Sequence, residues 1–151
     1  MNLFAKVLSF VLYSMIISSL FPAASIASNT VTIVDPCTLI AQADAGQAVH
    51  GGAEPAIVRG TMAGKFCHYR SSDHQMNVFV QNVNPQIMKT LPKLGAKAVP
   101  NVGDVAYLFR GSLFIQKGKN VVQINVYSNS LDGKVHTPEL LMLARLAASR
   151  M

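Results

Sequence analysis

Two short motifs bring residue types that can do chemistry close together in this sequence. Cys67 is followed by His68, a nucleophile beside a base, and Asp104 offers a carboxylate directly after Gly103. Neighbouring residues on a strand point to opposite faces, so the side chains of Cys67 and His68 could not hydrogen-bond to each other. An aspartate after a turn glycine is more often an acceptor for backbone N–H groups. We therefore predict no catalytic residue, and a small hydrolase that uses Asp104 is the least favoured function.

Histidine and methionine residues could supply ligands for copper or zinc. Imidazole and thioether groups suit copper, and the chain has four histidines and seven methionines. Their spacing matches no ligand motif, and Met76 lies in an alternating apolar stretch, where methionine usually fills packing gaps. The best pair is His68 with His74, on either side of an expected turn. We predict no metal and no other cofactor, and we keep a periplasmic copper- or zinc-handling protein as the alternative function.

The beginning of the chain has the three parts of a secretory signal. Lys6 precedes an apolar run that continues to Phe21, and small residues follow as far as Ala27. Serines and a proline interrupt the apolar run, which argues against a retained membrane anchor. We predict cleavage after Ala27, so that residues 1–27 are a signal peptide and residues 28–151 form a single domain.

Export would determine the compartment and the class of partner. The periplasm and the cell exterior are oxidising, and an even number of cysteines there predicts a bridge, here Cys37–Cys67. The net charge of +6 is spread along the sequence, without a basic cluster. We therefore expect an unknown envelope partner or a small ligand, no nucleic acid, and contact with the membrane only through the signal peptide.

The elements that would position these residues are helices at three places in the chain. Asp35-Pro36, Asn84-Pro85 and Thr137-Pro138 each combine a capping residue with a proline suited to the first helical turn. The first helix should end at Gly51, with a break near Gln42 left open. The middle helix should end by Leu91, because Pro92 disfavours helical geometry in the residue before it.

Apolar residues that alternate along the chain predict the strands. Short connections between them predict hairpins, so the sheet should be largely antiparallel. The expected fold is α+β, with a five- to six-stranded sheet and an N-terminal, a middle and a C-terminal helix packed on it. The expected strands are residues 56–62, 65–71, 76–81, 105–109, 112–117 and 120–128.

Four motifs together resemble a known family. They are Asp35-Pro36-Cys37-Thr38-Leu39, Cys67-His68-Tyr69, Gly103-Asp104-Val105-Ala106 and a late strand pair around Lys117-Gly118. Their order resembles a family of small exported bacterial domains, often lipoproteins, that is catalogued as a domain of unknown function. The resemblance covers residues 34–151, and it implies the Cys37–Cys67 bridge and an envelope location but no activity. The chain lacks the lipidation cysteine of many members. The predicted function is a non-catalytic binding or accessory domain, periplasmic or secreted.

Overall fold

One antiparallel sheet forms the centre of the structure. The computed structural model describes residues 34–61, 64–129 and 137–151. Within these ranges, seven strands pair in the order β1-β2-β3-β7-β6-β5-β4. The strands are β1 (Ile57–Thr61), β2 (Gly64–Arg70), β3 (Met76–Asn82), β4 (Lys97–Ala98), β5 (Val105–Phe109), β6 (Ser112–Lys117) and β7 (Asn120–Ser128).

The sheet consists of two runs of antiparallel strands that meet at β3 and β7. The first run is β1 to β3 and the second is β4 to β7. Seven residue pairs join β3 to β7, and the central ones are Val78 with Val126 and Val80 with Ile124. All four of these side chains are buried. The join between the two runs therefore lies in the hydrophobic core.

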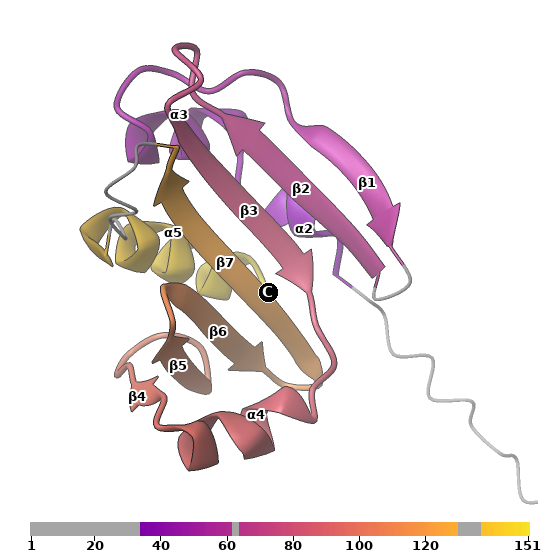
Figure 1. Cartoon of the computed structure of the whole chain (residues 1–151). Coiled ribbons are helices and arrows are strands. Elements are labelled where there is room, and N and C mark those ends of the chain that lie inside the picture. The colour runs from indigo at the N-terminus through magenta and orange to yellow at the C-terminus, as the bar shows by residue number, and fades with distance from the viewer. Residues whose placement is uncertain (1–33, 62–63, 130–136) are drawn as a thin grey trace, which may run out of the picture. The chain divides into compact units, whose positions relative to one another are not determined.

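Three helices cover one face of the sheet. They are α2 (Pro36–Leu39), α3 (Gln42–Ala48) and α5 (Thr137–Arg150), which lie behind the strands in Figure 1. One stripe of α5 packs into the core: Leu140, Leu143, Ala144 and Ala147 are fully buried. None of the helices in the described ranges is long and apolar enough to cross a membrane.

The last residue of α5 ties the helical layer together. The guanidinium of Arg150 donates to the carboxylate of Asp44 on α3 at 2.6 Å and to the carbonyl of Leu39 on α2 at 2.9 Å. A cation suits this end of a helix because the last carbonyl groups carry partial negative charge. One side chain therefore links the ends of three helices.

A second, smaller cluster lies on the opposite face of the sheet. The helix α4 (Ile87–Thr90) runs into the 3-10 helix η1 (Leu91–Leu94). Their buried residues Met88 and Leu91 pack with Phe114 of β6 and Val121 of β7. These two helical turns lie across the end of the sheet that carries β6 and β7 (Figure 1).

Two details of the predicted fold need correction. The sheet has seven strands, not five or six, because the long connection after η1 contains β4, which pairs Lys97 with Leu108 of β5. A strand of two residues is too short to show alternation in the sequence. The described ranges also contain four α-helices, not three, because the first predicted helix is split at Ile40, next to the break near Gln42 that the sequence had left open. The predicted signal peptide, residues 1–27, and its cleavage site after Ala27 lie outside the described residues.

The split between α2 and α3 is held by the sheet beneath it. Ile40 has extended backbone angles, φ −122° and ψ 115°. Its carbonyl accepts a hydrogen bond from the hydroxyl of Tyr69, which is buried on β2. This contact and the helix N-cap at Asp35 set both ends of the four-residue α2, since the Asp35 carboxylate accepts from the backbone N–H of Cys37 at 3.0 Å.

A disulfide joins the first turn of α2 to the sheet. Cys37 and Cys67 are bonded, with their Cα atoms 5.2 Å apart. Cys67 is fully buried on β2, beside the Tyr69 that contacts Ile40. The bridge therefore fastens the shortest helix of the helical layer to the core.

Removing this bridge should lower the stability of the fold without changing its topology. The bridge spans 30 residues, and loop closure of that length corresponds to about 3–4 kcal/mol in the chain-entropy model. We expect the Cys37→Ala/Cys67→Ala variant to lose about that much free energy of unfolding in urea titrations. A loss below about 1 kcal/mol would contradict a stabilising role for the bridge.

The charge of Asp35 should make a small, pH-dependent contribution to stability. The backbone hydrogen bond from Cys37 lowers the pKa of this carboxyl, and Lys65, 3.3 Å away, lowers it further. A folded-state pKa below the unfolded value of about 3.9 stabilises the fold above that pH, and the effect disappears as pH falls through the folded pKa. Asp35→Asn keeps a capping oxygen but removes the charge. We expect the wild type to be more stable at pH 7 by less than about 1 kcal/mol, and equally stable in acid, by chemical denaturation.

Candidate functional site

Half of one sheet face carries no helix among the described residues. On the side opposite α2, α3 and α5, the helix α4 and η1 lie over one end only, and β1, β2, β3 and the end of β7 are uncovered in Figure 1. We call this uncovered half the open face. Successive side chains of a strand point to opposite faces, which determines which residues reach the open face. On β2, Cys67 and Tyr69 point into the core, so their neighbours point outward. The outward residues of β2, β3 and β7 on the open face are Phe66, His68, Arg70, Asn77, Phe79, Gln81, Gln123, Asn125 and Tyr127.

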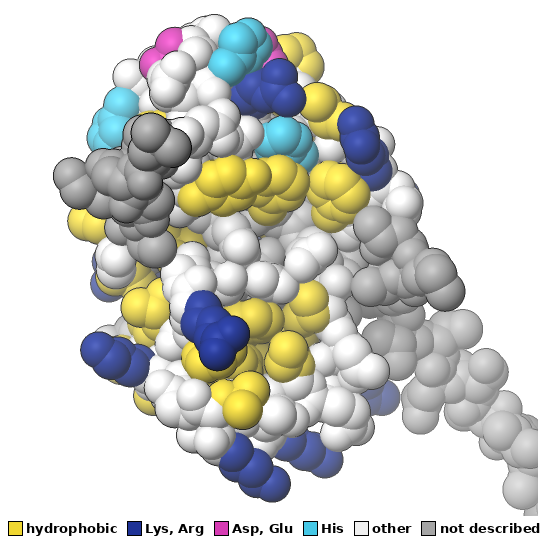
Figure 2. All heavy atoms as spheres, in the orientation of Figure 1, with side chains coloured by type: hydrophobic (Ala, Val, Ile, Leu, Met, Phe, Trp, Pro, Cys, Tyr) yellow, Lys and Arg dark blue, Asp and Glu magenta, His cyan; other side chains and the backbone are white. Residues whose placement is uncertain are grey.

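A row of four rings crosses the open face. His68 stacks on Phe79 with ring centroids 4.1 Å apart and planes 11° apart, and Tyr127 lies beside Phe79 at 5.4 Å and 10°. Phe66 is tilted against Phe79 at 6.1 Å. We call these four residues the aromatic row. None of them is fully buried, and Tyr127 is 37% exposed. Figure 2 shows hydrophobic side chains in a band across this part of the sheet.

A buried asparagine holds His68 in place. The side-chain oxygen of Asn77 can only accept, so the Nε2 atom of His68 donates to it at 2.8 Å. The amide nitrogen of Asn77 donates to the side chain of Asn129 at 2.9 Å. Asn77 is only 4% exposed, so its amide is paired on both sides, as burial of a polar group requires. The ring of His68 is thereby oriented by its partner as well as by Phe79.

A chain of polar side chains runs next to the aromatic row. The amide nitrogen of Gln81 donates to the side-chain oxygen of Gln123 at 2.8 Å. The amide nitrogen of Gln123 donates in turn to the hydroxyl of Ser112 at 3.1 Å. We call Gln81, Gln123 and Ser112 the polar belt. Each bond engages one of the two hydrogens of the donating amide, which leaves the second N–H for another acceptor.

The charges on the sheet all have one sign. No Asp or Glu occurs on the seven described strands, whereas Arg59, Lys65, Arg70, Lys97 and Lys117 do. Arg59 is exposed on β1 opposite Phe66. Burial raises the pKa of the Tyr127 hydroxyl, and the positive charge of nearby Arg70 opposes this rise. In Figure 2 the visible acidic side chains lie at one end of the molecule, away from the band of hydrophobic side chains.

The reactive residue types singled out in the sequence are held apart. Cys67 points into the core and is bonded to Cys37, whereas His68 points to the open face. His74 lies in the turn after β2, where its Nδ1 atom is 3.5 Å from the carboxylate of Glu54. His68 and His74 thus have different partners. Within the described ranges, no three His, Cys, Asp or Glu residues are grouped closely enough to hold a metal ion.

Asp104 has a structural partner in a hairpin turn. Its carboxylate accepts from the backbone N–H of Gly118 at 2.7 Å, and its own N–H donates to the carbonyl of Gln116 at 2.8 Å. Gly103 before it has a φ of +61°. Asp104 therefore fastens the loop before β5 to the turn between β6 and β7, as expected for an aspartate in a turn.

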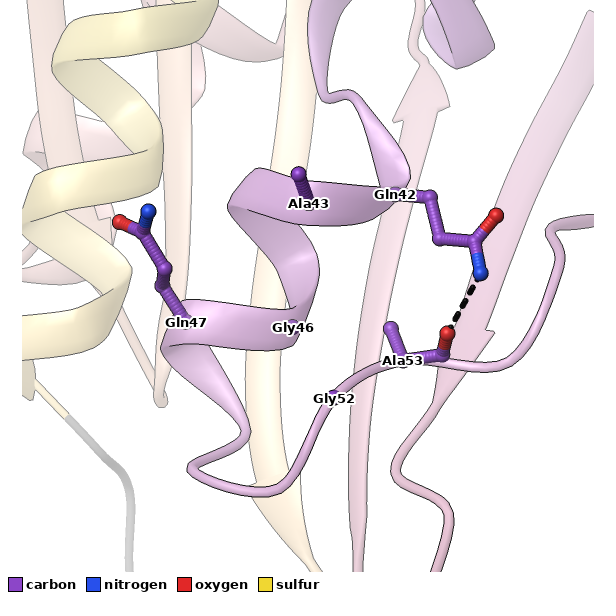
Figure 3. A pocket seen from close by; sticks show the side chains of 6 residues that line it. All are labelled: Gln42, Ala43, Gly46, Gln47, Gly52 and Ala53. Carbon is purple, nitrogen blue, oxygen red and sulfur yellow. Dashed lines mark hydrogen bonds between the residues drawn. The ribbon is translucent and has the colours of Figure 1, made fainter.

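A hollow lies beside α3, away from the aromatic row. It has a volume of about 600 Å³. In Figure 3 the side chain of Gln42 reaches across to the carbonyl of Ala53, a hydrogen bond of 2.7 Å, while Gln47 points the other way. The lining residues, Gln42, Ala43, Gly46, Gln47, Gly52 and Ala53, include no titratable side chain. The hollow therefore lacks the groups that acid–base or nucleophilic catalysis needs.

Comparison of the chain with protein-family models, with curated proteins and with solved structures finds no match.

The open face was not anticipated from the sequence, although a signal for it was present. The alternating aliphatic residues of β3 and β7 predict only the face of the sheet that is buried. The intervening positions of the strands point outward, and three of them are aromatic: Phe66, Phe79 and Tyr127. The outward face of a half-exposed strand is usually polar. Aromatic residues at these positions therefore indicate a binding surface.

Alanine substitutions at Gly103 and Gly118 should distinguish the cost of backbone strain from the cost of a steric clash near Asp104. Both have positive φ, but a Cβ at Gly103 would lie 2.6 Å from the carbonyl oxygen of Gln116, whereas one at Gly118 would meet nothing within 4 Å. We expect Gly118→Ala to cost about 1–2 kcal/mol of unfolding free energy, from the left-handed backbone alone. Gly103→Ala should cost about 2 kcal/mol more because the backbone around it must move. Equal losses in thermal or urea unfolding would show that the close approach at Gly103 is not required.

Proposed function

We propose that this chain is a non-catalytic binding domain of the bacterial envelope, which binds its ligand on the open face. The observation that carries the proposal is the aromatic row on the uncovered half of the sheet. Tyr127 is 37% exposed there, and Phe66, His68 and Phe79 are half-buried beside it. Grouped apolar surface on one face of a folded chain marks interaction sites more often than scattered apolar residues do.

The arrangement of the side chains suits binding better than catalysis. The rings are held by stacking and by the bond from His68 to Asn77, so a ligand would meet a surface that is already ordered. Tyrosine and other aromatic side chains with a polar end are favoured at interfaces because they cover large area with few rotatable bonds. Among the described residues, the open face presents no carboxylate or thiol that could act as a catalytic base or nucleophile, and the imidazole of His68 is stacked on Phe79 and hydrogen-bonded to Asn77.

The sequence supports the cellular setting of this proposal. The signal expected at residues 1–27 and the resemblance to exported domains of unknown function both favour an envelope protein. The Cys37–Cys67 bridge is in line with an oxidising compartment, where such bonds persist. Metal handling receives less support, because His68 and His74 are bonded to different partners and share no described ligand group.

The proposal predicts saturable binding to envelope material that depends on the aromatic row. The purified protein should co-sediment with a washed, insoluble bacterial envelope fraction, and the bound fraction should reach a plateau as protein is added. Tyr127→Ser removes the most exposed ring of the row. We expect it to weaken binding about tenfold, because stacking and burial of one aromatic ring are worth roughly 1–2 kcal/mol.

Leu94→Ser is the matched control. Leu94 is a large hydrophobic residue that is more exposed, at 57%, but it lies on η1, outside the aromatic row. Its substitution should leave the bound fraction unchanged, and both variants should unfold at temperatures near that of the wild type. Binding that is absent, or that weakens equally in both variants, would overturn the proposal.

A further inference from the structure

We infer that the ligand of the open face is an acidic polysaccharide that carries carboxylate groups, an inference that rests on the proposed function. The first argument is charge complementarity. Two positive side chains flank the aromatic row, Arg59 opposite Phe66 on β1 and Arg70 at the end of β2, and no strand of the described sheet supplies a negative one. A guanidinium group binds a carboxylate through two parallel hydrogen bonds. The open face therefore favours an anionic ligand.

The spread of these cations argues for a polymer and against a small molecule. Arg110 follows β5, beyond the edge of the open face, and its guanidinium lies 5.2 Å from the ring centroid of Phe109. Arg59 lies on β1, at the other edge of the sheet. Five strand-to-strand steps separate β1 from β5, and at about 4.8 Å each they place these two strands about 24 Å apart across the sheet. An extended chain can contact both, whereas a single small ligand cannot.

The stacking within the aromatic row argues against nucleic acid. Single-stranded nucleic acids bind to sheets by stacking their bases on free ring faces. Phe79, at the centre of the row, already has His68 stacked at 4.1 Å and Tyr127 nearly parallel at 5.4 Å. With two nearly parallel rings against it, Phe79 offers less free ring face to a base than an isolated aromatic side chain would. Ring edges carry partial positive charge, so they favour the oxygen atoms of an anionic ligand over a base.

The polar belt supplies groups that suit sugar hydroxyls. Gln81, Gln123 and Ser112 form a connected line across three strands, β3, β7 and β6. Each amide retains a second N–H donor, and the carbonyl oxygen of Gln81 is an acceptor. The polar belt thus places hydrogen-bond donors and acceptors on three neighbouring strands. Successive sugar units of a polymer, each with hydroxyl groups, could bind to them in turn.

The test measures binding of three soluble polymers to the purified protein by calorimetry in 150 mM salt. Polygalacturonate is the acidic polysaccharide, dextran is the neutral one, and oligothymidylate represents single-stranded nucleic acid. We expect polygalacturonate to bind at least tenfold more tightly than either of the others, and to compete with the envelope fraction for the protein. Its affinity should fall as salt is raised, because exposed charges are screened.

A double variant tests the arginines. Arg59→Gln/Arg70→Gln should weaken binding to polygalacturonate at least tenfold, and Arg59→Lys/Arg70→Lys should restore part of the loss because the charge returns without the planar group. The control is Lys119→Gln/Arg145→Gln, which removes the same charge from a hairpin turn and from α5. Both of its residues are exposed, and we expect less than a twofold change.

The outcomes separate this inference from the proposed function. Tighter binding of oligothymidylate, equal binding of dextran, or equal losses in the arginine and control variants would each overturn the inference. Saturable binding to the envelope fraction that depends on Tyr127 but is not competed by polygalacturonate would also overturn it, and would leave the proposed function standing. Absence of any binding that depends on Tyr127 would overturn both.

Discussion

The pairing of β3 with β7 is the constraint on which the rest of the structure depends. It joins two runs of strands that are otherwise separate along the chain, through seven residue pairs. On one side it buries Val78 against Val126 in the core, and on the other it places Phe79 beside Tyr127. Because strand side chains alternate, the same register that completes the core also assembles the open face. A shift by one residue would destroy both.

Local patterns along the chain accounted for most elements of the fold but not for their arrangement. The spacing of apolar residues alone predicts the strands with clear alternation and the buried side of α5. The short connections between strands predict an antiparallel sheet. The order of the strands could not be derived, because the pairing of Asn82 with Val122 bridges forty positions without any local signal. The split at Ile40 depends on a hydroxyl from Tyr69, a contact that only the folded chain creates.

The candidate site was harder to predict than the fold, for a physical reason. Sequence motifs mark residues with intrinsic reactivity, and in this chain such residues have structural partners: Cys67 is in a bridge, and Asp104 accepts a backbone hydrogen bond. The open face is made instead of rings and amides that are unremarkable singly. They become a surface only when β2, β3, β7 and β6 lie side by side. Its lack of negative charge is likewise a property of the assembled sheet and of no single segment.

The position of the bridge has a consequence for the order in which the chain can fold as it emerges with its N-terminus first. Cys37 and Cys67 both belong to the part of the chain that is made first, and β7 is made much later. The cross-link can therefore close while β3 still has an unpaired edge, with the apolar side chains of Val78 and Val80 lacking their partners on β7. An unpaired apolar strand edge is a template for association with other chains. Until β7 emerges, this half-built sheet presents such an edge.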